Sequence, residues 1–521
     1  MPMPSFDAIV IGGGTNGLAC ATRLAQAGQR VLVIEGRDKL GGSTAETDPW
    51  PGYRSPCLSH LLTHLDPRVE TQMKLADHGL SFVDRNIPST ALALDGNHLV
   101  LTGAAGDTIS GLISDADRTA WQGLRKRLMG FAGALAPFRA MTPPRLAKES
   151  GNQYLKLAQL GLGLRRLGRD EFREFLRLAL INIADVLEDD LADDRLRGLV
   201  AFDTVLGAWM GPRSPNSLFL YLNRLSGEIS GKRGATALPR SGMGSVATAM
   251  IQSAKTAGVE LKSGAMVERI IVENDRATGV ALASGEEISA TTVISAINPK
   301  TTFLDLVGPR HIDTGFANRT RNIRSRGGAS KLHLALKGTP DFRGANLRSR
   351  LVIAPSIRSV EDAFNAVKYG EVPTRPVMEI ILPSAFEAGH APDGHHVLSA
   401  IVQFAPHEPK DGKESARNAM LENTLSVLED HAPGIRALIE HSDFLMPYDI
   451  EDRYGMAGGN WHHGELAVEQ MLFLRPFPAV AQYSTPIAGL WLAGAGNHPG
   501  GGVSGAPGWN AAERILSRGR S

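Results

Sequence analysis

The N-terminal part of the chain alternates between unbroken apolar runs and a segment of small residues. Residues 6–11 and 31–34 are almost entirely apolar, which is typical of strands buried on both faces of a sheet. Residues 18–27, which lie between these runs, have the composition of a helix that ends at Gly28. This order predicts a strand–helix–strand unit with parallel strands.

Similar patterns return in two later parts of the chain. Residues 245–257 have helical spacing, and a last apolar run at 489–493 precedes a helical pattern around residues 510–516. Short apolar runs that we expect to be strands follow the first of these helices at 259–261, 265–272, 277–282, 287–290 and 292–296. These later segments therefore combine apolar runs with a helical pattern, as the N-terminal part does, without repeating its sequence.

The two long regions between these segments differ in periodicity. Residues 155–167 and 172–183 place apolar side chains at helical spacing, with Arg on the opposite face. Residues 331–336, 377–382 and 397–404 are apolar runs of strand length. We therefore expect helices in the first region and strands in the second.

The turn after the first apolar run has the spacing G-x-G-x-x-G, at Gly12, Gly14 and Gly17. In such a turn Gly12 permits the sharp bend, Gly14 lets the backbone approach a pyrophosphate, and Gly17 lets the helix pack closely on the strand. The helix N-terminus then offers free N–H groups to phosphates. Glu35, which follows the second apolar run, can accept hydrogen bonds from ribose hydroxyls. The complete unit predicts a dinucleotide-binding site.

The residues that follow Glu35 indicate which dinucleotide binds. Arg37 is followed by Gly41 and Gly42, and an acid followed by R-x-x-x-G-G resembles the N-terminal signature of flavoproteins that bind FAD. The second glycine pair would let the backbone pass close to the cofactor. We therefore expect FAD rather than NAD.

These elements predict an α/β fold with two discontinuous domains. Residues 1–70, 230–300 and 485–521 are expected to form a Rossmann-type FAD-binding domain. Residues 71–229 and 301–484 are expected to form an α+β substrate domain.

Composition and charge exclude several classes of partner. The chain has 521 residues, of which 43% are hydrophobic and 21% charged, as in ordinary globular proteins. A formal net charge of +1 gives no reason to expect a nucleic-acid partner. No run of about 18 apolar residues predicts a membrane-spanning helix. Only five residues precede the first predicted strand, so we expect no secretory signal and a cytoplasmic protein.

One region departs from this charge balance. Residues 118–178 contain 13 Lys or Arg and 4 acidic residues, a local net charge of +9. Because the basic side chains are interleaved with Leu and Phe, the region has two interpretations: a helical face in water balanced by the acids of residues 185–194, or a peripheral contact with a membrane surface. The first is favoured.

The two cysteines argue against disulfide chemistry. Cys20 lies in the first predicted helix and Cys57 in a proline-containing turn, so they form no C-x-x-C or C-x-x-x-x-C pair. Cys20 is most simply a small core residue.

Taken together, the segments resemble the phytoene desaturase-like branch of FAD-dependent oxidoreductases, and within it the group named pyridine nucleotide-disulfide oxidoreductase domain-containing protein 2. Three blocks carry the resemblance: residues 11–17 with Glu35 and Gly41–Gly42; residues 242–244 with 267–270; and residues 458–465, 473–476 and 494–508. The word disulfide in the group's name does not fit this chain, since the redox cysteine pair is absent.

The resemblance implies a set of cofactor contacts. Val267 would contact the adenine side through its backbone, the glycines at 500–502 would approach the flavin, and Asn497 stands where many flavoproteins place an Asp on the ribitol. A helix beginning beyond Gly505 would point its positive end at the flavin. The residues expected to bind FAD are Gly12, Gly14, Thr15, Asn16, Gly17, Glu35, Gly36, Arg37, Gly41, Gly42, Ser43, Val267, Gly496, Asn497, Gly501, Gly502 and Val503.

Catalytic residues are not defined by any motif. The candidates are His463 and Glu465 in the C-terminal block, and His60 beyond Cys57. Each also has a structural interpretation, as part of a hydrogen-bonded turn or as a buried histidine. No further residues at workable spacing suggest a metal site.

The resemblance implies transfer of a hydride from a C–H bond of an apolar or amphipathic small molecule to the flavin, with C–C desaturation as the leading reaction. Two alternatives stay open: amine oxidation on the same fold, and a flavin-binding protein with an interaction or regulatory role. An amine oxidase should show an aromatic pair flanking the flavin face. No second complete G-x-G-x-x-G unit is present, so oxygen or a quinone is a more natural electron acceptor than NAD(P)H.

Overall fold

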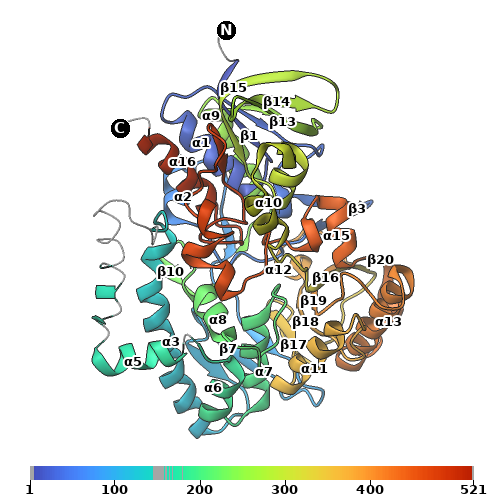
Figure 1. Ribbon diagram of the computed structural model, residues 1–521. Helices are drawn as coiled ribbons and strands as arrows, with labels where there is room; N and C mark the ends of the chain where they lie inside the picture. The colour runs from blue at the N-terminus through green and yellow to red at the C-terminus, as the bar shows by residue number, and fades with distance from the viewer. Residues whose placement is uncertain are drawn as a thin grey trace.

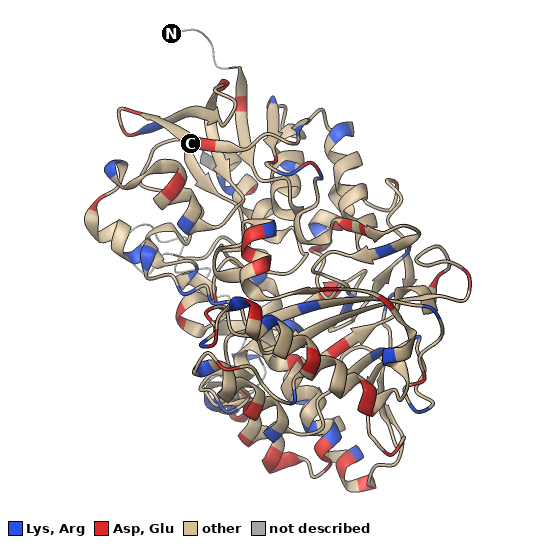
Figure 2. Ribbon diagram, turned by 90° about the vertical axis from the view of Figure 1, so that its right-hand side faces the viewer, with Lys and Arg blue, Asp and Glu red and all other residues tan. Residues whose placement is uncertain are grey.

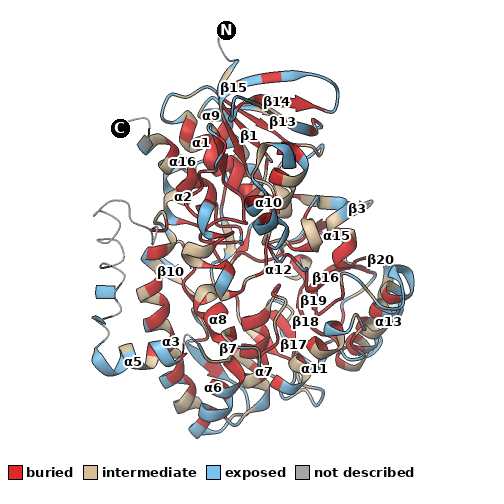
Figure 3. Cartoon of the chain, viewed as in Figure 1, coloured by how far each residue is buried: buried red, intermediate tan, exposed pale blue. Residues whose placement is uncertain are grey.

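The structure is a computed structural model that describes residues 5–144, 158, 161–163, 165–166, 168–178 and 180–518. Figure 1 shows two regions of β-sheet, one in the upper and one in the lower part of the view, each with helices packed against it. Both ends of the chain lie in the upper part. Figure 3 shows that buried residues run through the centre of both parts, while exposed residues lie on the outer helices and loops.

The upper sheet has seven strands in the order β12–β2–β1–β15–β14–β13, with β21 paired to β15. Strands β12, β2, β1, β15 and β21 pair in parallel, and β13, β14 and β15 pair antiparallel. The strand bounds are β1 (Phe6–Ile11), β2 (Val31–Ile34), β12 (Glu260–Lys262), β13 (Val267–Glu273), β14 (Arg276–Leu282), β15 (Glu287–Ser295) and β21 (Leu490–Leu492). This sheet therefore collects strands from three distant parts of the sequence.

The central strand β1 is apolar on both faces because both faces are covered. Ala8 and Val10 belong to a core cluster shared with the helices on one side. Ile9 and Ile11 belong to a second cluster, with Phe303, on the other side. The helices of the first side are α1 (Thr15–Ala25), α9 (Gly244–Thr256) and α16 (Ala506–Arg518). A strand buried on both faces needs no polar alternation, as the N-terminal pattern predicted.

Two of the predicted apolar runs, at 287–290 and 292–296, form one continuous strand. The first half of β15 pairs antiparallel with β14, where Val280 lies beside Ile288. The second half pairs in parallel with β1, where Val10 lies beside Ile294. The exchange of partners along a single strand explains why the sequence suggested two. The C-terminal helix begins at Ala506, directly beyond Gly505 as the resemblance implied and earlier than the pattern around residues 510–516 suggested.

The lower sheet has eight strands in the order β20–β16–β19–β18–β17–β6–β7–β8. The strands predicted at 331–336, 377–382 and 397–404 are confirmed as β16, β18 and β19. The bounds are β6 (Ser89–Ala91), β7 (Leu99–Thr102), β8 (Thr108–Ser110), β16 (Ala329–Leu336), β17 (Arg350–Ile353), β18 (Val377–Ile381), β19 (His396–Gln403) and β20 (Ile439–Leu445). Shorter ribbons pair β3 (Glu46–Trp50) with β4 (Tyr53–Pro56), β5 (Phe82–Asp84) with β11 (Leu238–Pro239), and β9 (Glu228–Ile229) with β10 (Lys232–Arg233).

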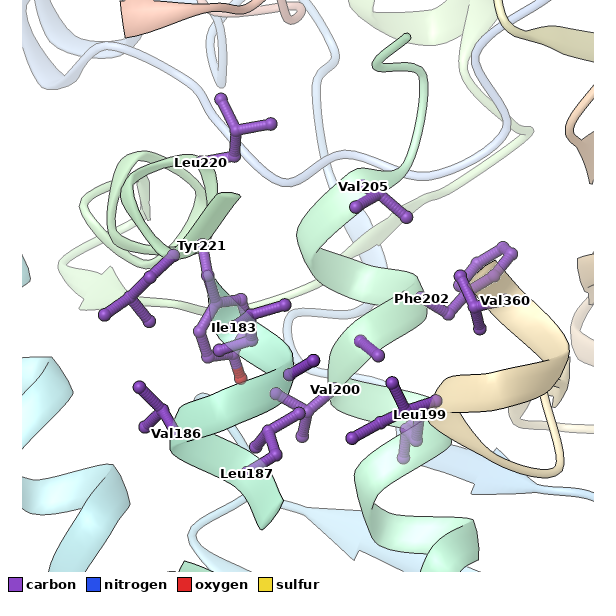
Figure 4. Packing of buried hydrophobic residues seen from close by; sticks show 14 of the residues in the cluster. Ile183, Val186, Leu187, Leu199, Val200, Phe202, Val205, Leu220, Tyr221 and Val360 are labelled. Carbon is purple, nitrogen blue, oxygen red and sulfur yellow. The ribbon is translucent and has the colours of Figure 1, made fainter. Parts of the chain in front are cut away.

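A helical layer packs against the lower sheet. Its members include α3 (Asp115–Arg139), α6 (Ile183–Asp190), α7 (Asp194–Val205), α8 (Ser217–Leu225) and α11 (Ile357–Lys368). Side chains of four of these helices point toward one another, among them Leu187, Phe202, Tyr221 and Val360 (Figure 4). The remaining helices are α2 (Pro67–Gln72), α5 (Arg169–Leu178), α10 (Thr314–Arg321), α12 (Pro383–Phe386), α13 (Lys413–His431), α14 (Ile435–Leu438) and α15 (Pro447–Tyr454).

The prediction of one continuous helix over residues 172–183 is wrong. Helix α5 ends at Leu178, and α6 begins separately at Ile183. Asn182 caps α6, because its side chain accepts a hydrogen bond from the backbone N–H of Asp185, 2.9 Å away. The helix predicted at 155–167 lies largely outside the described residues.

Several basic residues in the described part of the basic region pair with acids. Arg177 donates to Glu174 at 2.7 Å, and Arg125 forms an ion pair with Asp107 at 2.9 Å. Figure 2 shows that basic and acidic residues alternate along the outer helices. Among the described residues, no helix has the length and apolar character needed to cross a membrane.

Candidate functional site

The turn between β1 and α1 is built so that only glycine fits. Gly12 has φ +101°, in the left-handed region that side chains rarely adopt. A Cβ on Gly17 would lie 1.9 Å from the carbonyl oxygen of Gly12, so the first turn of α1 rests directly on the backbone before it. Helix α1 begins at Thr15, and its first N–H groups are available for an anion.

A second glycine turn packs against the first. The backbone N–H of Gly41 donates to the carbonyl of Gly13 at 2.9 Å. Gly41 and Gly42 have φ of +115° and +60°, and a Cβ on Gly42 would lie 3.1 Å from the Cα of Gly14. The two turns therefore approach closely through their backbones, and the Leu40 side chain also packs against Gly13.

Glu35, at the end of β2, is fixed by backbone donors. Its Oε2 accepts from the N–H of Gly13 at 2.8 Å, and its Oε1 accepts from the N–H of Arg37 at 3.0 Å. The carboxylate also lines the main cavity. It is thus positioned, with lone pairs to spare, for the hydroxyls of a ribose.

A cavity of about 470 Å³ joins these turns to the lower sheet. We call the first part of its lining the nucleotide end, made of Gly12, Gly14–Gly17 and Glu35–Arg37. We call the part near the lower sheet the inner wall, made of His60, Leu206, Arg224, Glu379 and Ile401. The C-terminal residues Gly502 and Val503 also line the cavity.

Several buried polar atoms near this cavity lack a partner. Among the described residues they include Oδ1 of Asn16, both side-chain polar atoms of Asn497, and Nδ1 of His462 and of His463. A buried polar atom without a hydrogen bond costs about 1–3 kcal/mol. Their grouping beside two glycine turns fits a polar ligand that satisfies some of them, as the pyrophosphate, ribitol and flavin of FAD would.

The inner wall contains a buried network of charges. His60 Nε2 donates to Glu379 Oε1 at 3.0 Å, and Arg350 Nε donates to Glu379 Oε2 at 2.6 Å. Arg350 also donates to Asp203 from its other end. The Lys331 ammonium lies 3.1 Å from His60 Nδ1. Five side chains from separate parts of the sequence are therefore joined by consecutive polar contacts.

The protonation of this network follows from burial and from Arg350. Burial acts to raise the pKa of Glu379, yet the Arg350 charge and the His60 hydrogen bond hold that pKa well below its usual value. Burial, together with the charge of Lys331, lowers the pKa of His60 to about 4. Burial also lowers the pKa of Lys331 to about 7, although Glu379 opposes this. Near neutral pH, Lys331 and neutral His60 can hold one additional proton between them.

The comparisons with known proteins agree with this geometry. The sequence matches the family described as flavin containing amine oxidoreductase over residues 17–516. The chain belongs to this family. It is 30% identical to pyridine nucleotide-disulfide oxidoreductase domain-containing protein 2 of Rattus norvegicus, over 98% of this chain and 94% of that protein.

Two further comparisons extend the family relation. Phytoene desaturase (neurosporene-forming) of Cereibacter sphaeroides is 26% identical, over 97% of this chain and 94% of that protein. Cyclohexylamine oxidase from Brevibacterium oxydans has a similar fold, with a TM-score of 0.59 at 17% identity over 99% of this chain and 100% of that chain. The Rossmann-type α/β fold is confirmed, and FAD is the cofactor of this flavin oxidoreductase.

Most residues expected to bind FAD line the cavity of this flavin oxidoreductase. Those in the lining are Gly12, Gly14, Thr15, Asn16, Gly17, Glu35, Gly36, Arg37, Gly42, Ser43, Val267, Gly502 and Val503. Gly41, Gly496, Asn497 and Gly501 are not in the lining. Gly41 instead supports the adjoining turn through its bond to Gly13.

The other three residues outside the lining have different surroundings. A Cβ on Gly496 would lie 2.7 Å from the Pro299 ring. Asn497 is fully buried. Gly501 does not have a left-handed φ, and its close neighbour is a side chain: a Cβ there would lie 2.0 Å from Nδ1 of His462. Gly501 therefore makes room for His462, which itself lines the cavity.

The three catalytic candidates have different positions. His60 and His463 line the cavity, and burial lowers the pKa of His463 to about 4. Glu465 is buried outside the lining and accepts from Arg326 Nε at 2.8 Å and Arg324 Nε at 3.1 Å. These bonds give Glu465 a structural role in the C-terminal block.

Sequence reasoning missed most of the inner wall network. Lys331, Arg350 and Glu379 lie in strands β16, β17 and β18, whose other residues are largely apolar. A charged residue within an apolar strand must find a partner, because an unpaired buried charge is very costly. That signal could have marked them as a group, although it would not have shown which charges pair.

The cysteines and the aromatic rings complete the site. Cys20 and Cys57 are free and buried in different core clusters, and burial raises the pKa of both thiols. The aromatic rings in the described cavity lining are Tyr454 and Trp461. Tyr454 packs on the guanidinium of Arg37, and Trp461 donates to His462. The two rings thus contact different residues.

Proposed function

We propose that this FAD-dependent oxidoreductase removes a hydride from a C–H bond of an apolar or amphipathic small molecule and leaves a C=C double bond. The observation that carries the proposal is the cavity, which runs from the nucleotide end to an inner wall that combines apolar side chains with a proton acceptor. A relative named as a phytoene desaturase supports the same reaction type.

The cofactor would be held mainly by backbone groups. The N-terminus of α1 would bind the pyrophosphate, with Gly12, Gly14 and Gly17 allowing its approach. Glu35 would accept from the adenosine ribose. Gly502 and Val503 would border the flavin, and the N-terminus of α16 would favour negative charge there. Bound FAD supplies a two-electron acceptor at N5 of its ring.

The chain's own residues would orient the substrate and take up a proton. In a desaturation, one carbon loses hydrogen with both bonding electrons and its neighbour loses a proton, so that the second pair forms the double bond. His60, which lines the cavity, would take up that proton at Nδ1 and pass it to neutral Lys331, whose Nζ lies 3.1 Å away behind the lining. Leu206, Ile401 and the other apolar lining residues would exclude water from the reacting carbons.

Amine oxidation is a weaker candidate on the same cavity. It would be favoured by two aromatic rings facing each other across the flavin, whereas Tyr454 and Trp461 serve separate neighbours. The electrons would then pass to oxygen or a quinone. A regulatory flavoprotein would bind FAD without reducing it.

Anaerobic titration of the FAD-loaded protein with isoprenoid, fatty-acyl and amine compounds tests the proposal. We expect bleaching of the flavin absorbance by a molecule with an apolar chain, and formation of one double bond per flavin reduced. A Lys331→Met variant should keep its FAD but be reduced more slowly. Bleaching by amines alone would favour amine oxidation, and no bleaching by any class would favour the regulatory alternative.

A further inference from the structure

We infer that the substrate carries an anionic group, of which a carboxylate is the simplest, and that Arg224 binds it. This inference rests on the proposed function, since it names the substrate class of the same cavity. It makes Arg224 a residue that determines specificity rather than one that takes part in the chemical step.

Arg224 stands at a junction between two cavities. It lies in the last turn of α8 and lines both the main cavity and a smaller one of about 40 Å³. The two cavities also share Thr63 and Thr236. The side chain of Arg224 keeps 20% of its surface exposed, unlike that of Arg350, which keeps 1%.

The guanidinium of Arg224 has unused donors. Among the described residues, its side chain makes no hydrogen bond. Its ion pair with Asp203 is long, at 3.6 Å, and Asp203 already accepts a hydrogen bond from Arg350. A guanidinium has five N–H donors in a fixed fork that matches a carboxylate, so Arg224 is free to bind one.

The charges of the inner wall also favour an anion. Three cationic side chains, Arg224, Arg350 and Lys331, are grouped around two carboxylates, Asp203 and Glu379. Arg350 connects both carboxylates. When Lys331 is protonated, an anion beside Arg224 would balance the group.

Among the described residues that make up the inner wall, no carboxylate is free for a cationic substrate. Glu379 lines the cavity, but His60 occupies its Oε1 and Arg350 its Oε2. An amine at this place would have to compete with both donors. The apolar residues Leu206, Ile401 and Met456 line the same cavity, so the fitting molecule is an apolar chain that ends in an acid.

Binding of three probes to the FAD-loaded protein tests this inference: octanoate, octan-1-ol and octylamine, followed by the change in the absorption spectrum of oxidised FAD. A charge-assisted hydrogen bond changes affinity by roughly 10- to 100-fold. We therefore expect octanoate to bind at least ten times more tightly than octan-1-ol and octylamine. Equal binding of the three probes, tighter binding of octylamine, or no saturable binding would overturn the inference.

Variants assign the preference to Arg224. Arg224→Gln should weaken octanoate binding by roughly 10- to 100-fold and leave octan-1-ol within about twofold. Arg224→Lys should keep much of the preference. Arg213→Gln, at an exposed Arg paired with Glu188, is the matched control and should change neither probe. If both Arg224 variants lose both probes, Arg224 is structural and the inference is wrong.

This test separates the inference from the proposed function because it measures binding, not flavin reduction. A protein that selects octanoate but is reduced by no organic donor would contradict the proposed function alone. A protein that is reduced by neutral donors and shows no preference for acids would contradict this inference alone.

Discussion

The two ends of the cavity are lined by different chemical groups. At the nucleotide end, glycines and other backbone groups form much of the surface, and Glu35 adds a carboxylate. At the inner wall, side chains such as His60, Arg224 and Glu379 form the surface, and they come from segments far apart in the sequence. A backbone surface depends on short-range spacing, whereas a side-chain network depends on how distant strands meet.

The largest expected effect is on stability, at the inner wall. Glu379→Ala removes a carboxylate partner of the buried Arg350 charge. This loss should lower the free energy of unfolding by about 3–5 kcal/mol. Urea unfolding of the FAD-free protein measures this loss. Glu188→Gln, which removes an exposed partner of Arg213, should cost less than about 1 kcal/mol. If the two variants lose similar amounts of unfolding free energy, the buried network does not stabilise the inner wall.

The next effect is on cofactor binding, at the nucleotide end. Gly17→Ala places a Cβ 1.9 Å from the carbonyl oxygen of Gly12, so the turn must move and FAD affinity should fall by roughly 100-fold or more. Fluorescence titration of FAD measures it. Gly123→Ala is the matched control, because Gly123 also lies in a helix and a Cβ there meets nothing within 4 Å. A tightly bound FAD in Gly17→Ala would contradict the role given to this turn.

A smaller effect is expected where the two kinds of surface meet. Gly501→Ala should displace His462 and weaken FAD binding by about tenfold, since a Cβ would lie 2.0 Å from His462 Nδ1. Because the collision is mainly with the ring, the loss should be partly recovered in a His462→Ala background. Equal losses in the two backgrounds would show that Gly501 meets the cofactor and not His462.

The last expected effect concerns pH and needs no substitution. Because the pKa of Lys331 is lowered to about 7, its neutral form predominates above pH 7 and disappears below it. The rate of anaerobic flavin reduction should therefore rise about tenfold per pH unit up to pH 7 and then level off. Lys331→Met should be slow at every pH, while Lys262→Met, at an exposed Lys paired with Glu286, should keep the parent profile. A parent rate that does not change between pH 5 and 9 would exclude Lys331 as the proton acceptor.

The same contrast explains what the sequence could predict. The turn at Gly12–Gly17, the acid at Glu35, the strands of the upper sheet and three strands of the lower sheet follow from local spacing and apolar runs, and the structure contains them. Strands β6, β7 and β8 lie in the region expected to be helical, and β17 and β20 were not predicted. The network around Glu379 could not be derived, because its members are joined only when β16, β17 and β18 pair. Gly501 shows an intermediate case: the glycine was expected to matter, but the neighbour that requires it is His462.

The order of the strands also sets the timing of assembly during synthesis. Strand β21 and residues Gly502 and Val503 complete the upper sheet and its cavity, although β1 and the first glycine turn are made first. Chains grow from the N-terminus and fold as they emerge. The chain must therefore carry an unfinished cofactor site through most of its translation, and FAD can be captured in its final setting once residues 490–503 have been added.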